Sequence, residues 1–439
     1  MAIKRILVNL NMELKEYKLG DLIEVTRGMS LPGEFYSTEG KYIRLTCGNF
    51  DYVNNSFKEN KSKDDLYYVG KIKPEFIMEK GDIITPLTEQ AIGLLGSTAI
   101  IPESGKYIQS QDVAKVTCKK GMIDHDFAYY LIPSKCVKEQ LSAAAQQTKI
   151  RHTSPDAIKA CKVFVPPLSE QKKIASVLSA LDDKIALNKK MNQKLEAMAK
   201  RLYDYWFVQY DFPDKNGHPY KTTGVPMTYN PTLKREIPAG WEVKTLKECI
   251  KHINTGLNPR DNFVLGNGDI KYVTVKNLTT EGNIDFSGCD LIDEDALKKV
   301  HKRSDIAKGD VLYASICPLG RSYLINKDPI GWDINESVFS IRPNLDVISS
   351  EFLSMFLKDS AVVEKASKMA TGSIFKGIRI KELENMIFAV PAKNVMESFS
   401  KQIKNLIELE HKNIEEITRL TALRDKLLPL LMNGQVVVG

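Results

Sequence analysis

The sequence predicts an α+β fold in which two similar mixed α/β domains are separated by a long antiparallel two-helix coiled coil with pseudo-two-fold symmetry. Three repeated features predict it. The segment Lys80-Gly81-Asp82-Ile83-Ile84 recurs as Lys308-Gly309-Asp310-Val311-Leu312, an offset of 309 − 81 = 228. The pair Val165-Pro166 recurs as Val390-Pro391, an offset of 391 − 166 = 225. A heptad pattern follows each Val-Pro pair, so the repeat covers both a domain and a helix.

These repeats divide the chain of 439 residues, which is long enough for two or three domains that each bury a core. The expected segments are a first domain at 13–166, a first spacer helix at 167–208, a linker at 209–236, a second domain at 237–391 and a second spacer helix at 392–433.

The first domain has the pattern of short strands with one short helix. Residues 42–46 (YIRLT) alternate as a strand does, and residues 82–85 (DIIT) form a second strand after a Lys-Gly turn. Residues 126–131 (DFAYYL) predict a short helix. Residues 146–152 (QQTKIRH) are polar and basic, which is typical of a surface loop.

A long helix is expected after Pro166-Pro167, with Ser169 as a candidate N-cap. Its apolar seam alternates steps of four and three and has polar positions at its centre, which fix register at some cost in stability. A helix over 169–207 would be roughly 58 Å long. The main seam residues are Ile174, Leu178, Leu181, Ile185, Asn188, Leu195 and Leu202.

The second copy repeats this organisation. Residues 209–240 lack periodicity and are rich in Pro and Gly, which predicts an extended linker, and Trp241 opens the second domain. Asn413 matches Asn188, and Gly434 ends the second helix. Antiparallel pairing is favoured because it brings the end of the first helix near the second domain. The second seam comprises Phe399, Ile403, Leu406, Asn413, Ile417, Leu420 and Leu427.

Composition excludes several classes of protein. No apolar run approaches the 18 residues of a membrane span, and the start lacks the features of a signal peptide. Seven scattered cysteines without CxxC spacing predict neither a disulfide framework nor a zinc site, which favours a reducing cytoplasm. The formal net charge of +7 permits a polyanionic partner without requiring one.

Several segments resemble one family, the specificity subunits of type I restriction-modification systems. The domains open with EYKLGDLIEVTRG and GWEVKTLKECI, and PPLSEQKKIASVLSALDDKI follows the first domain. The linker carries WFVQYDFPDKNGHPYKTTG and REIPAGW. The second helix departs from the pattern, because it starts with PAKNVMESF rather than a PPLSEQ-type opening.

The resemblance implies that the two domains are target recognition domains, each reading one half of a split, asymmetric DNA site. It implies that the partners are double-stranded DNA, two DNA methyltransferase (modification) subunits docked on the helices and, in a cleaving complex, a restriction/translocase subunit. No membrane partner is expected.

Motifs for catalysis are missing from the sequence. An adenine methyltransferase needs an Asn/Asp-Pro-Pro-aromatic motif and a Gly-rich methyl-donor loop, but Pro166-Pro167 lies between Val165 and Leu168. Neither a Walker A motif nor HExxH occurs. We therefore expect a non-catalytic subunit with no catalytic residues, no cofactor and no metal site.

Candidate DNA contacts lie in three polar segments that recur in both domains. Such side chains suit base edges and phosphates. In the first domain they are Arg44, Thr46 and Asn49; Thr88, Glu89 and Gln90; and Gln146, Gln147, Lys149 and Arg151. In the second domain they are Thr274, Lys276 and Asn277; Ser315 and Arg321; and Ser373, Lys376 and Arg379.

Each residue taken singly could equally be a solvated loop residue. For the whole protein, the alternative is a duplicated coiled-coil scaffold or adaptor that joins proteins and binds no DNA. The matched polar loops and the linker motif favour DNA recognition.

Overall fold

A computed structural model describes residues 7–8, 13–52, 54–89, 93–144, 151–372 and 376–438. The chain forms two compact units, and each is described by itself. Unit 1 comprises residues 1–189 and 414–439, and unit 2 comprises residues 190–413. Each long helix therefore contributes one part to each unit.

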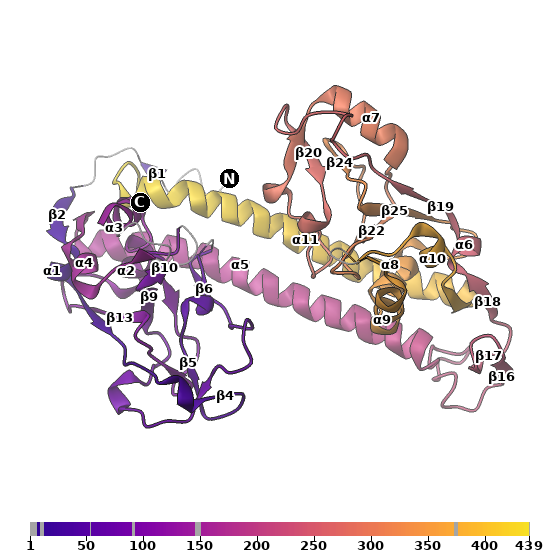
Figure 1. Ribbon diagram of the computed structural model, residues 1–439, viewed down its shortest axis with the longest axis horizontal. Coiled ribbons are helices and arrows are strands. Elements are labelled where there is room, and N and C mark those ends of the chain that lie inside the picture. Colours follow the sequence, from indigo (N-terminus) through magenta and orange to yellow (C-terminus); the bar gives the residue numbers. More distant parts are fainter. Residues whose placement is uncertain are drawn as a thin grey trace. The chain divides into compact units, whose positions relative to one another are not determined.

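In its described residues, unit 1 consists of short strands, short helices and its parts of the two long helices (Figure 1). Its strands are β1 (Leu7–Val8), β2 (Lys15–Lys18), β3 (Ile23–Arg27), β4 (Tyr36–Ser37), β5 (Tyr42–Arg44), β6 (Phe50–Asp51), β7 (Ser56–Phe57), β8 (Tyr67–Tyr68), β9 (Ile83–Pro86), β10 (Thr88–Glu89), β11 (Ala99–Ile100), β12 (Tyr107–Ile108), β13 (Val113–Cys118), β14 (Arg151–His152), β15 (Lys162–Val165) and β27 (Val437–Val438). Its helices are α1 (Leu19–Leu22), α2 (His125–Leu131), α3 (Lys135–Ala144), α4 (Pro155–Ala160) and the first part of α5 (Leu168–Tyr203), together with the last part of α11 (Lys393–Met432).

Unit 2 has the same kinds of elements. Its strands are β16 (Met227–Asn230), β17 (Arg235–Pro238), β18 (Glu242–Thr245), β19 (Ile250–Thr255), β20 (Ile270–Val273), β21 (Asp290–Ile292), β22 (Val311–Ala314), β23 (Ser322–Leu324), β24 (Trp332–Ile334), β25 (Val338–Pro343) and β26 (Ile387–Val390). Its helices are α6 (Leu246–Cys249), α7 (Glu294–Ser304), α8 (Ser350–Lys358), α9 (Ser360–Met369) and α10 (Ile380–Glu384), with the remaining parts of α5 and α11.

The central sheets of the two units have the same strand order. Unit 1 has β11-β9-β13-β3, and unit 2 has β23-β22-β25-β19. Val116 lies between Ile83 and Val25 in the first sheet, and Ile341 lies between Val311 and Ile253 in the second. All six side chains are buried, so a shift of one residue would replace them with side chains of the other face of the sheet.

Other pairings repeat as well. Strand β5 pairs in parallel with β12, and β20 pairs in parallel with β24. The Asp124 carboxylate caps α2, and Ser349, an offset of 225, caps α8. The predicted fold class of two similar mixed α/β domains is confirmed, as is the helix predicted near 126–131.

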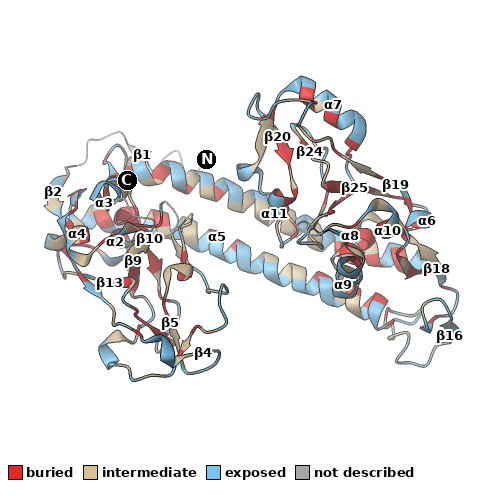
Figure 2. Cartoon of the chain, in the orientation of Figure 1, coloured by how far each residue is buried: buried red, intermediate tan, exposed pale blue. Residues whose placement is uncertain are grey.

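The two long helices pair antiparallel within each unit. In unit 1, Ile174 and Leu178 of α5 share a core with Leu427 and Leu431 of α11. In unit 2, Asn192 accepts a hydrogen bond of 2.8 Å from the Asn413 amide. In Figure 2, exposed positions dominate both helices and buried positions recur at intervals, which is the pattern of a helix buried along one stripe.

The heptad seam is not buried uniformly. Ile185, Asn188, Phe399, Ile403 and Leu420 are buried. The seam positions of intermediate exposure are Leu181, Leu195, Leu202, Leu406, Asn413 and Ile417. Two seam positions hold charged side chains, Glu410 and Arg424.

The prediction of an extended linker is wrong. Residues 209–236 fold onto unit 2, because their aromatic side chains insert into its core. Tyr210 and Phe212 are buried, and their rings lie 5.5 and 5.3 Å from the ring of Trp241. Strand β16 pairs antiparallel with β17, and Thr222 donates to Asp211. The Pro and Gly content correctly indicated turns, but it did not indicate that these aromatic side chains pack into the core of unit 2.

Among the described residues, no helix is both long and apolar enough to cross a membrane.

Candidate DNA interface

Two of the three predicted segments pair with each other in both units. In unit 1, β10 pairs antiparallel with β14, so Thr88 lies opposite His152 and Glu89 opposite Arg151. In unit 2, Ile316 forms a bridge with Gly377. Ile316 is offset from Thr88 by 228 residues, and Gly377 is offset from His152 by 225 residues. The repeated pairing brings the second and third segments together on both domains.

The first segment contacts the second in both units. In unit 1 the Cys47 sulfur lies 2.9 Å from the Thr88 hydroxyl oxygen. In unit 2 the Arg321 guanidinium donates to the carbonyl of Val275 at 3.5 Å. The three segments therefore form one continuous region on each domain.

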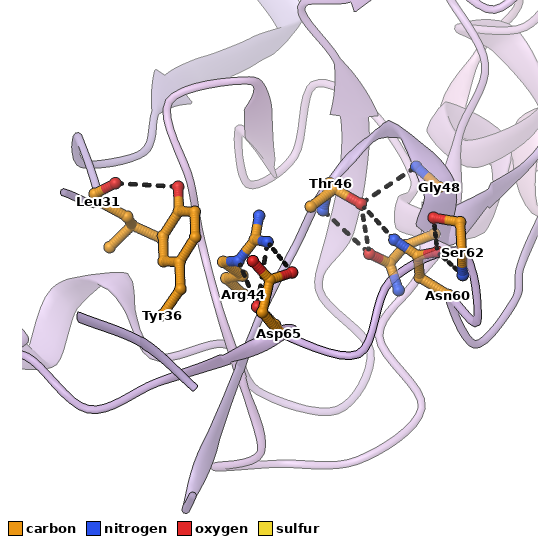
Figure 3. Close-up of polar contacts among 9 residues, drawn as sticks. Leu31, Tyr36, Arg44, Thr46, Gly48, Asn60, Ser62 and Asp65 are labelled. Carbon is orange, nitrogen blue, oxygen red and sulfur yellow. Dashed lines mark hydrogen bonds and ion pairs between the residues drawn. The ribbon is translucent and has the colours of Figure 1, made fainter. Parts of the chain in front are cut away.

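Thr46 and Asn49 hold a 3₁₀ turn, η3 (Cys47–Asn49), rather than facing solvent as DNA contacts would. The Thr46 amide donates to the Asn49 side-chain oxygen at 2.9 Å, and the Asn49 amide group donates to the Lys58 carbonyl. Asn60 also donates to the Thr46 hydroxyl at 2.9 Å (Figure 3). Asn49 is buried, so its amide satisfies backbone groups.

Thr274 and Asn277 make the same contacts around η6 (Val275–Asn277). The Thr274 amide donates to the Asn277 oxygen at 2.9 Å, and Asn277 donates to the Asp285 carbonyl. The sequence signal for this structural role was the identical Thr-x-x-Asn at an offset of 228. Residues that read different half-sites would differ, whereas these are the same in both copies.

Arg44 is also held inside its domain. Its guanidinium pairs with the Asp65 carboxylate at 3.2 Å, donates to the Asp65 carbonyl, and stacks over the Tyr36 ring at 3.8 Å (Figure 3). The residue is only 6% exposed. The guanidinium of Arg44 is therefore engaged by other parts of the domain. This placement does not support the prediction that Arg44 contacts DNA.

Arg151 is partly buried and paired. It lies 3.3 Å from the Glu89 carboxylate and donates to the Ser142 hydroxyl at 2.9 Å. The other oxygen of Glu89 accepts the backbone amides of Gly93 and Leu94 at 2.6 and 2.8 Å. Glu89 is one polar residue of its loop in the sequence, but in the structure its carboxylate connects the second and third segments and also binds the backbone at Gly93 and Leu94.

The remaining second-domain candidates differ in exposure. Lys376 and Arg379 are exposed, and Lys276 is exposed and pairs with Asp290 at 3.1 Å. Ser315 is buried and donates to the Ser337 carbonyl. Lys376 and Arg379 are thus the second-domain candidates best placed to meet an anionic backbone.

Five candidates from the two domains lie outside the described residues: Gln90, Gln146, Gln147, Lys149 and Ser373.

We expect the substitution Glu89→Gln to loosen the first domain's interface. The glutamine keeps an acceptor but loses the ion pair to Arg151 and the charge that strengthens the amide contacts, at a cost of about 1–3 kcal/mol. Hydrogen exchange of the Leu94 and Leu95 amides measures this local loss. The control is Glu103→Gln, which removes an exposed pair with Lys106. Equal protection in the two variants would contradict the prediction.

All seven cysteines lie in the described residues and are free thiols. Within the same residues, no group of three or more His, Cys, Asp or Glu side chains is placed to hold a metal ion.

Comparison with known proteins identifies the family. The model of the type I restriction modification DNA specificity domain matches twice, at residues 11–197 and 238–419. The MjaIX specificity subunit of a type I restriction enzyme from Methanocaldococcus jannaschii is 27% identical over 97% of this chain and 89% of its own length. The HindI specificity subunit from Haemophilus influenzae is 22% identical over 96% of this chain and 99% of its own length.

A solved structure has the same fold. The crystal structure of the S subunit of a type I restriction-modification system from M. genitalium aligns with a TM-score of 0.58 at 18% identity, and the alignment covers 97% of both chains. The two family matches cover most of the chain and fall on its two similar domains, so the chain belongs to the type I restriction modification DNA specificity domain family.

Proposed function

We propose that this chain is the DNA sequence-recognition subunit of a type I restriction-modification complex. The duplicated family match carries the proposal, together with the same three segments meeting on each of two domains. Two domains with different exposed residues suit a split, asymmetric target. Their expected bounds are 13–166 and 237–391, with spacer helices at 167–208 and 392–433.

Methyl transfer and cleavage then belong to partner subunits. The relatives are named as specificity subunits, which supports a non-catalytic role. The proposed partners are double-stranded DNA, two methyltransferase subunits on the exposed faces of α5 and α11, and a restriction/translocase subunit where the complex cleaves. Free thiols throughout support a reducing cytoplasm as the location.

The test is a pair of substitutions in the second domain, Lys376→Ala with Arg379→Ala. We expect weaker recognition of one half-site and an unchanged base preference in the other, because each domain carries its own interface. A base contact would cost about 1–3 kcal/mol at one position, whereas a phosphate contact would lower affinity on all sequences and make the salt dependence shallower. Binding of the complex with its methyltransferase to a duplex library randomised in both half-sites measures both effects.

The matched control is Lys308→Ala. Lys308 is exposed and precedes β22, whereas the interface residue Ser315 follows that strand, so the control removes a charge at the opposite end of the same strand. Loss of base preference in both halves would refute two independent domains. If the complex shows no salt-dependent binding to duplex DNA, the alternative function, a coiled-coil scaffold that joins proteins and binds no DNA, is favoured instead.

A further inference from the structure

Unit 2 contains a cavity that no part of the proposed DNA recognition uses. It has a volume of about 300 Å³ and lies among α5, α11 and α8. Its apolar lining includes Ala199, Met355 and Ile407. This volume is at the lower end of the range of small-molecule sites.

Charged side chains from the surrounding elements line the same cavity. The four carboxylates are those of Glu196, Asp204, Asp359 and Glu410, and the two ammonium groups are those of Lys200 and Lys358. The formal charge of these six groups is 2 − 4 = −2. His411 also lines the cavity, and its ring nitrogen lies against the Asn326 amide. An acidic cavity in a chain of net charge +7 is a local feature, not a consequence of the overall charge.

Some of these charges are already neutralised or engaged. Lys200 pairs with Asp204 at 3.0 Å, and Asp359 accepts the first amides of α9. The two glutamates share Lys358 as a nearby cation. Burial raises the pKa of Glu410 to about 7 and also raises the pKa of Glu196, so both carboxylates lack full compensation for their loss of solvent.

The internal repeat shows what fills the equivalent space in unit 1. At the offset of 225, Ala199 corresponds to Arg424, and Ile407 corresponds to Asp182. The Arg424 guanidinium pairs with Asp182 at 2.9 Å and with Asp425 at 2.8 Å. Tyr130, the equivalent of Met355, donates to the other Asp182 oxygen at 2.7 Å. A built-in cation therefore occupies unit 1 where unit 2 has a cavity.

We propose that the cavity of unit 2 binds a small organic cation that carries a guanidinium or primary ammonium group. Glu196 and Glu410 from the two long helices supply the counter-charges of the cationic head. The alkyl part fills the space beside Ala199, Met355 and Ile407, where unit 1 has Arg424, Tyr130 and Asp182. This site is separate from the DNA interface, so it does not depend on the proposed function.

The test uses agmatine, which carries both head groups, in a calorimetric titration of the full chain. We expect one equivalent to bind. Glu410→Gln should weaken binding at least about tenfold, because it removes a counter-charge while leaving the shape of the side chain. Ala199→Arg should abolish binding, because the longer side chain fills the space that the alkyl part needs. Glu416→Gln, which removes a partly buried carboxylate of the same helix that does not line the cavity, should bind as the unchanged chain does.

Three results would overturn the proposal: no binding by the unchanged chain at about 1 mM agmatine, equal affinity of Glu410→Gln and Glu416→Gln, or full binding by Ala199→Arg. If Ala199→Arg does not fold, the two glutamine variants decide between the outcomes. Separate titrations with methylguanidine and butylamine assign the preferred head group.

Discussion

Replacing Arg424 with alanine is expected to destabilise the helix pair of unit 1 by about 3 kcal/mol. Arg424 is 8% exposed and pairs with both Asp182 and Asp425, and Asp182 also accepts the Tyr130 hydroxyl. Removal of the guanidinium leaves the Asp182 carboxylate beside buried side chains without its main counter-charge. Hydrogen exchange of α2 and of the last turns of α11 reports the local free energy of unfolding.

The chain provides a matched control on the same helix. Arg419→Ala removes a bidentate pair with Glu416, in which the arginine side chain is 64% exposed, so the expected cost is about 0–1 kcal/mol. Joint replacement of Arg424 and Asp182 by methionine and leucine should recover most of the loss, since an apolar pair of similar volume avoids the desolvation of two charges. Equal costs for Arg424→Ala and Arg419→Ala would show that burial of the pair contributes nothing.

The sequence predicted the elements whose signal is periodic or repeated. The offsets of 225 and 228 align the sheets of both units, because equivalent strands need equivalent apolar positions. The antiparallel helix pairing followed from the order of domains and helices. These features depend on many residues at once, so no single substitution obscures them.

The sequence did not separate polar residues that bind other parts of the chain from polar residues that face solvent. Asn49 and Asn277 appear as loop amides, and only the folded turn shows that each satisfies backbone groups of its own domain. The structural role of Arg44 depends on its contact with Asp65, which lies 21 residues away in the sequence. Such partners depend on chain folding over distances that local patterns do not encode.

Two charged seam residues carry a signal that is visible in the sequence itself. Glu410 and Arg424 stand at seam positions where apolar side chains are expected, and a charge at such a position predicts a buried partner or a cavity. Arg424 has the partner, and Glu410 lines the cavity. The aromatic residues of the linker carried a similar signal, because clustered aromatics in a Pro-rich segment indicate attachment to a core.

The largest expected loss of stability follows from Phe207→Ala, which should destabilise unit 2 by about 3–5 kcal/mol. The Phe207 ring lies 4.6 Å from Phe399 and 4.9 Å from Phe352, both in edge-to-face geometry. It also contacts Tyr203 and Trp241. Its removal leaves a void among rigid aromatic rings that cannot close around it, because they belong to α5, α8, α11 and the chain entering β18.

Tyr205→Ala is the matched control, two residues away in the π-helical turn Asp204–Val208. Tyr205 is 38% exposed, so its loss should change the free energy of unfolding by no more than about 0.5 kcal/mol. Thermal unfolding followed by calorimetry, with hydrogen exchange to locate the change, should show that Phe207→Ala affects the amides of unit 2 first. Phe207 belongs to the core of unit 2, whereas the first domain belongs to unit 1. As temperature rises, recognition of the half-site read by the second domain should therefore fail before recognition of the other half-site. Simultaneous loss of both half-sites would mean that the two units unfold as one cooperative structure, and the independence expected of two recognition domains would then be wrong.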